Sequence, residues 1–181
     1  MPTSAKPSRE TETILRHWHA AVPNDRLAHL VRDASRAFAR ALSSRLAEHG
    51  IPFGHWTFLR ILWENDGITQ RELSTEAGVM EPTTHVALNA METMGYILRK
   101  RRPENRRNVY VHLTPRGRAL KTKLVPLAEN VNAIGVAGLS AADIGTVRRA
   151  LIAIIDNLAR DEALAEVAAT VENVARPKRA R

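Results

Sequence analysis

One segment near the middle of the chain carries the local signals of two short helices joined by a tight turn. Thr69 and Glu72 have the spacing of a capping box, which predicts that a helix begins there. Gly78 is expected to end this helix, and Pro82 suits the first turn of a second helix that should end at Gly95. Two helices separated by a short turn that contains glycine predict a helix-turn-helix.

The periodicity of the sequence changes directly after this segment. Residues 96–98 are Tyr-Ile-Leu, and in residues 109–113 valine and leucine alternate with Tyr110 and His112. Such a period of two predicts two short strands, around a basic loop at residues 99–108 that is longer than the tightest hairpin turns. A β-hairpin that follows a helix-turn-helix predicts a winged helix, so the expected fold class is mainly α with a small β-hairpin wing.

Positive charge is concentrated in the same hairpin. The chain has 27 Lys and Arg against 19 Asp and Glu, a formal net charge of +8. Residues 99–107 hold six basic side chains and one acidic one, and residues 176–181 hold four basic side chains and no acidic one. These two short stretches account for the whole excess. A basic strip on an otherwise balanced protein indicates a polyanionic partner such as nucleic acid.

Apolar stripes at helical spacing flank the predicted winged helix. Before it lie an amphipathic segment at 11–22 and, after a start signal at Pro23-Asn24-Asp25, a helix over 27–49; after it lie two heptad-like stripes, over 120–134 and 144–158. These helices have little to pack on except each other or a second copy of the chain. They predict a dimerisation module made from both chain ends.

We therefore expect five regions along the chain. They are a disordered N-terminus (1–10), N-terminal dimerisation helices (11–50), a winged helix-turn-helix (51–113), C-terminal dimerisation helices (114–175) and a basic tail (176–181).

Composition excludes several classes of protein. The chain contains no cysteine, which excludes a disulfide framework and a zinc site with cysteine ligands. Its apolar stretches are shorter than the roughly 18 residues of a membrane span, and the polar N-terminus lacks the apolar core of a signal peptide, so we expect a cytoplasmic protein. No HExxH, GxGxxG, P-loop or nucleophile-elbow pattern occurs, so neither an enzyme nor a cofactor is expected.

Taken together, these segments resemble the MarR family of bacterial transcriptional regulators. The resemblance covers about residues 25–160 and is carried by ITQRELSTEAGV and by EPTTHVALNAMETMGYILRKRRPENRRNVYVHLTPRGRAL, in which LTPRGRAL is particularly typical. It implies a homodimer with two winged helix-turn-helix lobes that binds short palindromes in double-stranded DNA. Members usually repress nearby genes and often release DNA when a small phenolic or other anionic ligand binds.

The resemblance also implies which residues contact DNA. Helix 82–94 would enter the major groove, with Thr84, Ala87, Leu88 and Met91 facing inward and Asn89 pairing bidentately with adenine. The complete set of expected contacts is Thr69, Gln70 and Ser74 on phosphates, Thr83, His85, Val86 and Asn89 on the helix face, and Arg99, Arg101, Arg106 and Arg107 on the wing.

Two departures from the family pattern concern the same surface. Many members have Thr-Arg where this chain has His85-Val86, and Asp-x-Arg where it has Asn105-Arg106-Arg107. The first removes an arginine–guanine contact, and the second removes an acidic partner for a wing arginine. We therefore expect modest base readout and a large share of the affinity from the wing.

The resemblance further implies an effector pocket between the dimer module and the DNA-binding lobe. Arg60 would meet the carboxylate of an aromatic acid while Trp56 or Trp63 packs on its ring. Arg36, Arg40 and His29 are weaker candidates, and Trp18 is a further one. The alternative is that both indoles belong to the core and that Arg60 extends to the surface.

Two other functions remain open from the sequence. A metal-responsive regulator of the same fold could gather a cation with histidines and carboxylates, and the candidate ligands are His17, His19, His29, His49 and His55. A DNA binder driven by charge alone is the second alternative, which the helix-turn-helix disfavours.

Overall fold

The structure is a computed structural model that describes residues 8–20 and 27–175, without the side chains of Arg106 and residues 167–175. The chain divides into two compact units, residues 1–135 and residues 136–181. The start signal expected at residues 23–25, the basic tail and most of the expected disordered N-terminus lie outside the described residues.

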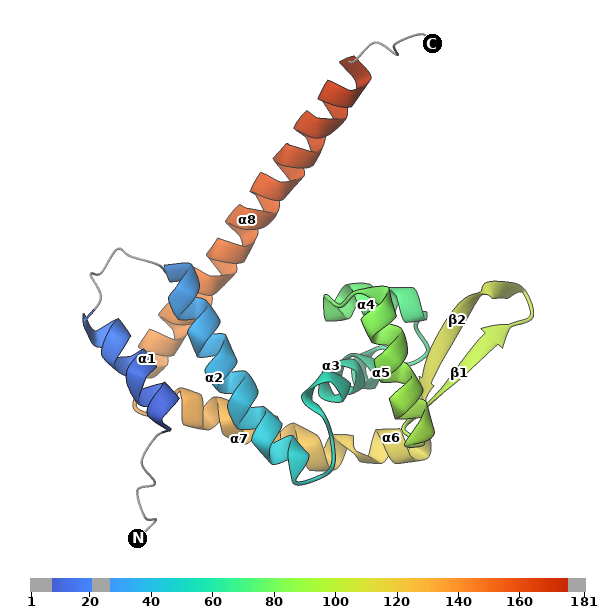
Figure 1. The fold of residues 1–181 in the computed structure, drawn as a ribbon, viewed down its shortest axis with the longest axis horizontal. Coiled ribbons are helices and arrows are strands. Elements are labelled where there is room, and N and C mark those ends of the chain that lie inside the picture. The colour runs from blue at the N-terminus through green and yellow to red at the C-terminus, as the bar shows by residue number, and fades with distance from the viewer. Residues whose placement is uncertain (1–7, 21–26, 176–181) are drawn as a thin grey trace. The chain divides into compact units, whose positions relative to one another are not determined.

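The described part of the first unit is helical apart from one hairpin (Figure 1). Its helices are α1 (Arg9–Ala20), α2 (Leu27–Ala47), α3 (Phe53–Glu64), α4 (Gln70–Ala77), α5 (Glu81–Thr93), α6 (Pro115–Ala119) and α7 (Lys121–Gly135), and its strands are β1 (Ile97–Arg102) and β2 (Asn105–Leu113). The second unit contains α8 (Ala141–Ala175). The fold is mainly α with a two-stranded antiparallel wing, which confirms the expected fold class.

The helix-turn-helix is confirmed, together with the signals that predicted it. Thr69 caps α4: its hydroxyl accepts the N–H of Glu72 at 3.2 Å, and the Glu72 carboxylate accepts the N–H of Thr69 at 2.7 Å. Gly78 ends the helix in the left-handed conformation (φ +62°), which glycine adopts without a steric penalty. The buried Ser74 hydroxyl donates to Thr84 at 2.8 Å and so joins α4 to α5.

The core of the first unit is one apolar cluster to which α2, α3, the helix-turn-helix, the base of the hairpin and α7 all contribute. Leu59, Leu73, Leu88, Met91 and Val111 are all fully buried in it. Of the four α5 side chains expected to face inward, Thr84, Leu88 and Met91 are buried and Ala87 is partly buried against the core, so the opposite face of the helix is toward solvent.

The hairpin differs from its sequence-based prediction, which was wrong about the loop. The strands pair from Ile97 opposite Leu113 to Arg102 opposite Asn105, so only Pro103 and Glu104 form the turn. The basic residues of β1 therefore stand on a paired strand instead of a long loop. Arg106 and Arg107 lie where the register shifts, between the partners of Arg101 and Arg102. Beyond the core both faces of the ladder are exposed, and such a strand carries no apolar alternation from which its length could be predicted.

A close crossing of two backbones holds the base of the hairpin. The Thr114 N–H donates to the Tyr96 carbonyl at 3.0 Å, and the Thr114 hydroxyl accepts the N–H of Gly117 at 3.0 Å and donates to the Gly95 carbonyl at 2.7 Å. A Cβ at position 117 would overlap the Tyr96 carbonyl oxygen. The glycine of the LTPRGRAL segment is therefore required by close packing.

The helix expected to follow Thr114 is divided into α6 and α7 near Leu120. Trp63 Nε1 donates to the Gly117 carbonyl at 3.0 Å, the group that would accept the N–H of Lys121 in a continuous helix. A side chain that bonds to a backbone carbonyl of a helix replaces the hydrogen bond from residue i to residue i−4 and so interrupts the helix.

The N-terminal helices α1 and α2 are joined by a hydrogen bond and by the Arg40–Glu10 ion pair. Trp18 Nε1 donates to Asp33 at 3.1 Å, and the hydrogen bond from Arg32 is the main cause that lowers the pKa of the Asp33 carboxyl. Of the apolar stripe expected along α2, Leu42 is buried, together with the neighbouring Leu46, whereas most of the residues before them are exposed.

The α8 helix carries an exposed apolar stripe. None of the side chains of residues 141–166 is buried. The exposed apolar residues include Ile144, Val147, Leu151, Ile152, Ile155, Leu158 and Leu164. No helix within the described residues combines the length and the apolar character that a membrane span requires.

We expect Gly117→Ala to destabilise the protein, because the added methyl would overlap a backbone oxygen that cannot rotate away. Overpacking of this kind costs about 1–3 kcal/mol, which should lower Tm by several degrees. Thermal unfolding followed by circular dichroism measures the shift. Gly54→Ala is the matched control, since this glycine also lies in a helix and a Cβ there meets nothing within 4 Å. Equal Tm values for the two variants would contradict the close crossing.

We expect His55 to make the free energy of unfolding depend on pH. His55 is buried, its Nδ1 has no hydrogen-bond partner among the described residues, and burial lowers the pKa of its imidazole below the ordinary 6.5. Below pH 6.5 the unfolded chain therefore binds a proton at His55 that the folded chain does not bind. The contribution of His55 to the free energy of unfolding is fully present above this pH and decreases as the pH falls toward the folded pKa.

The measurement is urea unfolding at several pH values between 5 and 8, at constant protein concentration. His55→Leu should flatten the pH dependence by at most about 1.4 kcal/mol per pH unit, the value for one proton. His49→Leu, at an exposed position, is the control. A pH dependence unchanged in His55→Leu would show that this imidazole is not the cause.

Candidate functional site

The α5 helix presents an exposed face opposite its buried stripe. Thr83, His85, Val86 and Asn89 are exposed, and Val86 keeps 68% of its surface in contact with solvent. An apolar side chain so exposed has no role in the core. An α-helix with one exposed face has the width that the major groove of B-DNA admits. The structure therefore leaves accessible each residue predicted to contact bases.

A hydrogen-bonded cluster joins this face to the hairpin. From β1, Arg99 donates to the Glu92 carboxylate through Nε at 3.0 Å and through Nη2 at 2.7 Å, and Nη2 also donates to Asn89 Oδ1 at 2.6 Å. The hydrogen bonds from Arg99 lower the pKa of the Glu92 carboxyl. Arg99 was expected among the DNA contacts, and the role of Glu92 was not predicted from the sequence. A glutamate that precedes the hairpin by a few residues is the signal that could have indicated this ion pair.

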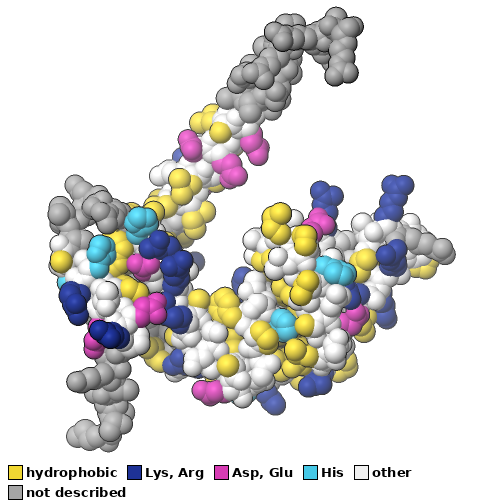
Figure 2. All heavy atoms as spheres, viewed as in Figure 1, with side chains coloured by type: hydrophobic (Ala, Val, Ile, Leu, Met, Phe, Trp, Pro, Cys, Tyr) yellow, Lys and Arg dark blue, Asp and Glu magenta, His cyan; other side chains and the backbone are white. Residues whose placement is uncertain are grey.

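The hairpin carries the cations of the interface. Lys100, Arg101, Arg102 and Arg107 are exposed, and the Arg102 guanidinium lies 3.9 Å from the centroid of the Tyr110 ring, a cation–π contact that orients it. Figure 2 shows Lys and Arg side chains projecting from the region of the helix-turn-helix and hairpin. Arg106 lies in β2, but its side chain is outside the described part of the structure. A row of exposed cations on paired strands can neutralise several phosphates.

The structure corrects two of the expected phosphate contacts on α4. Thr69 is buried and its hydroxyl is used by the capping box with Glu72, while Ser74 is buried against Thr84. Neither side chain is accessible to a phosphate. Gln70, which follows the cap, is half-buried and remains a candidate.

A cavity of about 350 Å³ lies between α2, α3 and α7. A volume of this size is within the range of small-molecule sites. Trp56 and Arg60 line it, as predicted from the sequence, and the other lining residues are Ser35, Phe38, Ala39, Leu42, Phe53, Ala128, Val131 and Asn132. Arg60 is exposed and forms no ion pair with the residues that the structure describes. The cavity thus combines an apolar wall with one available cation.

The five other candidates for a ligand site do not line this cavity. Trp63 packs edge-to-face on Trp56, with ring centroids 5.7 Å apart, but its indole N–H is bonded to Gly117. Arg40 lies 3.8 Å from Glu10, whereas Arg36 and His29 are exposed and do not line the cavity. Trp18, bonded to Asp33, is not among the lining residues either.

Two polar groups that α2 and α7 bring to the cavity, Ser35 and Asn132, were not predicted from the sequence. Neither was Phe38, whose ring lies so close to Gly135 that a Cβ there would overlap it. These positions lie on different helices, and no local pattern connects them.

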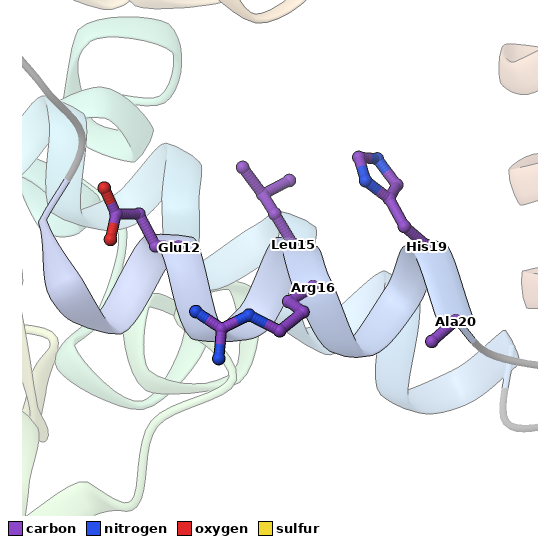
Figure 3. Close-up of a pocket in the computed structure, with 5 residues that line it drawn as sticks. All are labelled: Glu12, Leu15, Arg16, His19 and Ala20. Carbon is purple, nitrogen blue, oxygen red and sulfur yellow. The ribbon is translucent and has the colours of Figure 1, made fainter.

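A shallow hollow on α1 lacks the combination of an apolar wall and an available cation that the cavity between α2, α3 and α7 has. Figure 3 shows Glu12, Leu15 and His19 pointing from the same side of this helix, with Arg16 beside them. All four side chains are exposed and come from a single helix. Across the described ranges, 8–20 and 27–175, no three histidine, aspartate or glutamate side chains are grouped closely enough to hold a metal ion.

Comparison with known proteins identifies the family. The model of the MarR family matches residues 53–109. The HTH-type transcriptional regulator TtmR of Methylorubrum extorquens (strain PA1) is 33% identical over 149 residues, which cover 81% of this chain and 72% of that protein.

Solved structures show the same fold. A putative MarR family transcriptional regulator from Listeria monocytogenes, in complex with a 26mer DNA, has a TM-score of 0.68 at 24% identity and covers 77% of this chain and 93% of its own. BpsR of Bordetella bronchiseptica has a TM-score of 0.64 at 21% identity and covers 75% of this chain and 99% of its own. TtmR and the Listeria protein are described as transcriptional regulators. The chain therefore belongs to the MarR family and is a DNA-binding transcriptional regulator with a winged-helix fold.

Proposed function

We propose that the chain is a ligand-responsive repressor that acts in the cytoplasm as a homodimer on a pseudo-palindromic operator. The observation that carries the proposal is the exposed face of α5, with Thr83, Val86 and Asn89, beside a hairpin of exposed cations. The helix face would read bases, and the wing would neutralise phosphates and supply much of the affinity, with Arg107 and Arg106 at the minor groove.

The homodimer is supported by the apolar side chains that α8 leaves exposed, among them Leu151, Ile155 and Leu158. A helix with such a stripe lowers its free energy by packing on a second apolar surface, and a second copy of the same chain supplies one. A two-fold axis would then place two α5 helices in successive major grooves. Half-sites about 34–36 Å apart are the expected operator geometry.

An aromatic acid is the proposed class of effector. The cavity supplies an indole wall from Trp56 and a guanidinium from Arg60, which suit the ring and the carboxylate of such a ligand. BpsR, the Bordetella protein of similar fold, is described as regulated in its DNA binding by 6-hydroxynicotinic acid, an aromatic acid. The metal-responsive alternative finds no comparable group of ligands among the described residues.

We expect specific binding to the DNA that flanks the protein's own gene. Fluorescence anisotropy should give an affinity for this fragment at least 10³-fold above that for a shuffled duplex at physiological salt, a roughly typical ratio for regulators of this kind. In a salt series, Arg107→Ala should reduce the slope of log K against log salt by about 0.9, because one phosphate contact is lost. Equal affinity for both duplexes would favour a binder driven by charge alone.

We expect aromatic acids to change the intrinsic tryptophan fluorescence and to release the operator. Arg60→Gln should weaken the binding of benzoate or salicylate by about tenfold or more, since a hydrogen bond to a charged group is lost, but should leave the neutral benzamide unaffected. Arg36→Gln is the matched control, because this exposed arginine does not line the cavity. A flat fluorescence response to the whole panel, or an equal loss in both variants, would contradict this site.

A further inference from the structure

The amide of Asn89 is held by a neighbouring cation on the exposed face of α5. Arg99 Nη2 donates to Asn89 Oδ1 at 2.6 Å. The guanidinium is itself fixed, because the Glu92 carboxylate accepts bonds from its Nε and Nη2 and also accepts the backbone N–H of Arg99 at 3.0 Å. The Arg99 side chain is only 18% exposed. Folding therefore sets the position of this cation beside Asn89, before any partner binds.

This contact determines the orientation of the Asn89 amide, that is, the positions of its Oδ1 and Nδ2 atoms. A reversed Asn89 side chain would direct its Nδ2 hydrogens at a guanidinium, so the oxygen must face Arg99 and accept its hydrogen bond. The charged donor makes this bond stronger than a neutral one. Asn89 Nδ2 and its two hydrogens remain for bonds to a partner, whereas a donor that approached the second lone pair of Oδ1 would also approach the Arg99 guanidinium. This point of the interface therefore presents donors and positive charge.

In the major groove, guanine and adenine differ in the hydrogen-bond donors and acceptors that they present. Guanine presents two acceptors, N7 and O6, whereas adenine presents the N7 acceptor and the N6 amino donor. An unrestrained asparagine pairs with adenine because its oxygen accepts from the amino group. Beside Arg99, that amino group would face an oxygen already bonded to a cation, while a guanine O6 would face donors only.

We propose that the Glu92–Arg99 pair converts Asn89 into a hydrogen-bond donor, so that the protein selects guanine over adenine at the base pair that Asn89 contacts. This replaces the adenine pairing expected from the sequence. Arg99 acts as a positioning residue through Asn89, and Glu92 anchors it. The inference rests on the proposed entry of α5 into the major groove and specifies what one position of that helix reads.

The test begins with the operator and the wild-type protein. The position read by Asn89 is the base pair at which wild type discriminates between bases and Asn89→Ala does not. At this position we expect guanine to be preferred over adenine by about tenfold, the order of one specific base contact. A preference for adenine there, or specific operator binding in which no base pair depends on Asn89, would overturn the inference.

The role of Arg99 is tested by the double variant Glu92→Met/Arg99→Met, which removes both charges and so leaves no unpaired one. The ratio of guanine to adenine affinity should fall to about one or invert. Arg102→Met is the matched control: it removes one arginine from the same strand, at a side chain stacked on Tyr110, and should weaken binding to both sequences without changing their ratio. A guanine preference retained in the double variant would overturn the role of Arg99.

A measurement on the wild-type protein alone covers the case in which the double variant does not fold. Adenine at the same position is replaced by 2-aminopurine, which also pairs with thymine but carries no amino group in the major groove. We expect no loss of affinity, because Asn89 accepts nothing from that group; a tenfold loss would overturn the proposal. Failure of the proposed function is distinguishable, since wild type would then show no preference for the operator over shuffled DNA.

Discussion

The DNA-binding part of the chain depends on the backbone crossing at Gly117 and Tyr96. Four elements meet within a few residues of it: the end of α5, the start of β1, the end of β2 and the start of α6. Thr114 bonds to both sides of the crossing, and Trp63 of α3 caps the Gly117 carbonyl from a third direction. Any side chain at position 117 would separate these backbones. The packing of α5 against the base of the hairpin thus depends on the absence of a side chain at position 117.

Two carboxylates organise a region in which most charges are positive. Glu72 closes the cap of α4 and Glu92 fixes Arg99, and the hydrogen bonds that each accepts lower the pKa of its carboxyl. Both groups are therefore ionised well below neutral pH and keep their partners in place. The charge of Glu92 is offset by the Arg99 guanidinium, so this carboxylate does little to oppose a polyanion outside.

The sequence predicted the elements whose causes are local. The cap at Thr69, the left-handed Gly78 and the buried stripe of α5 depend on residues within one or two turns, so they could be recognised in one dimension. Features that depend on packing between distant segments could not. Thr69 and Ser74 were expected at phosphates because nothing local shows their burial, and the tie between Arg99 and Asn89 exists only once β1 lies beside α5. Likewise, Ser35 and Asn132 meet across the cavity although they are almost a hundred residues apart.

The short turn at Pro103 and Glu104 has a thermodynamic consequence for the wing. A flexible basic loop would lose backbone entropy when it settles on a partner, about 1–2 kcal/mol for each residue that becomes fixed. In this chain the four basic residues of β1, at positions 99–102, are already paired with β2. The ordering of their backbone is completed during folding, so a partner that binds them does not bear that part of the entropy cost.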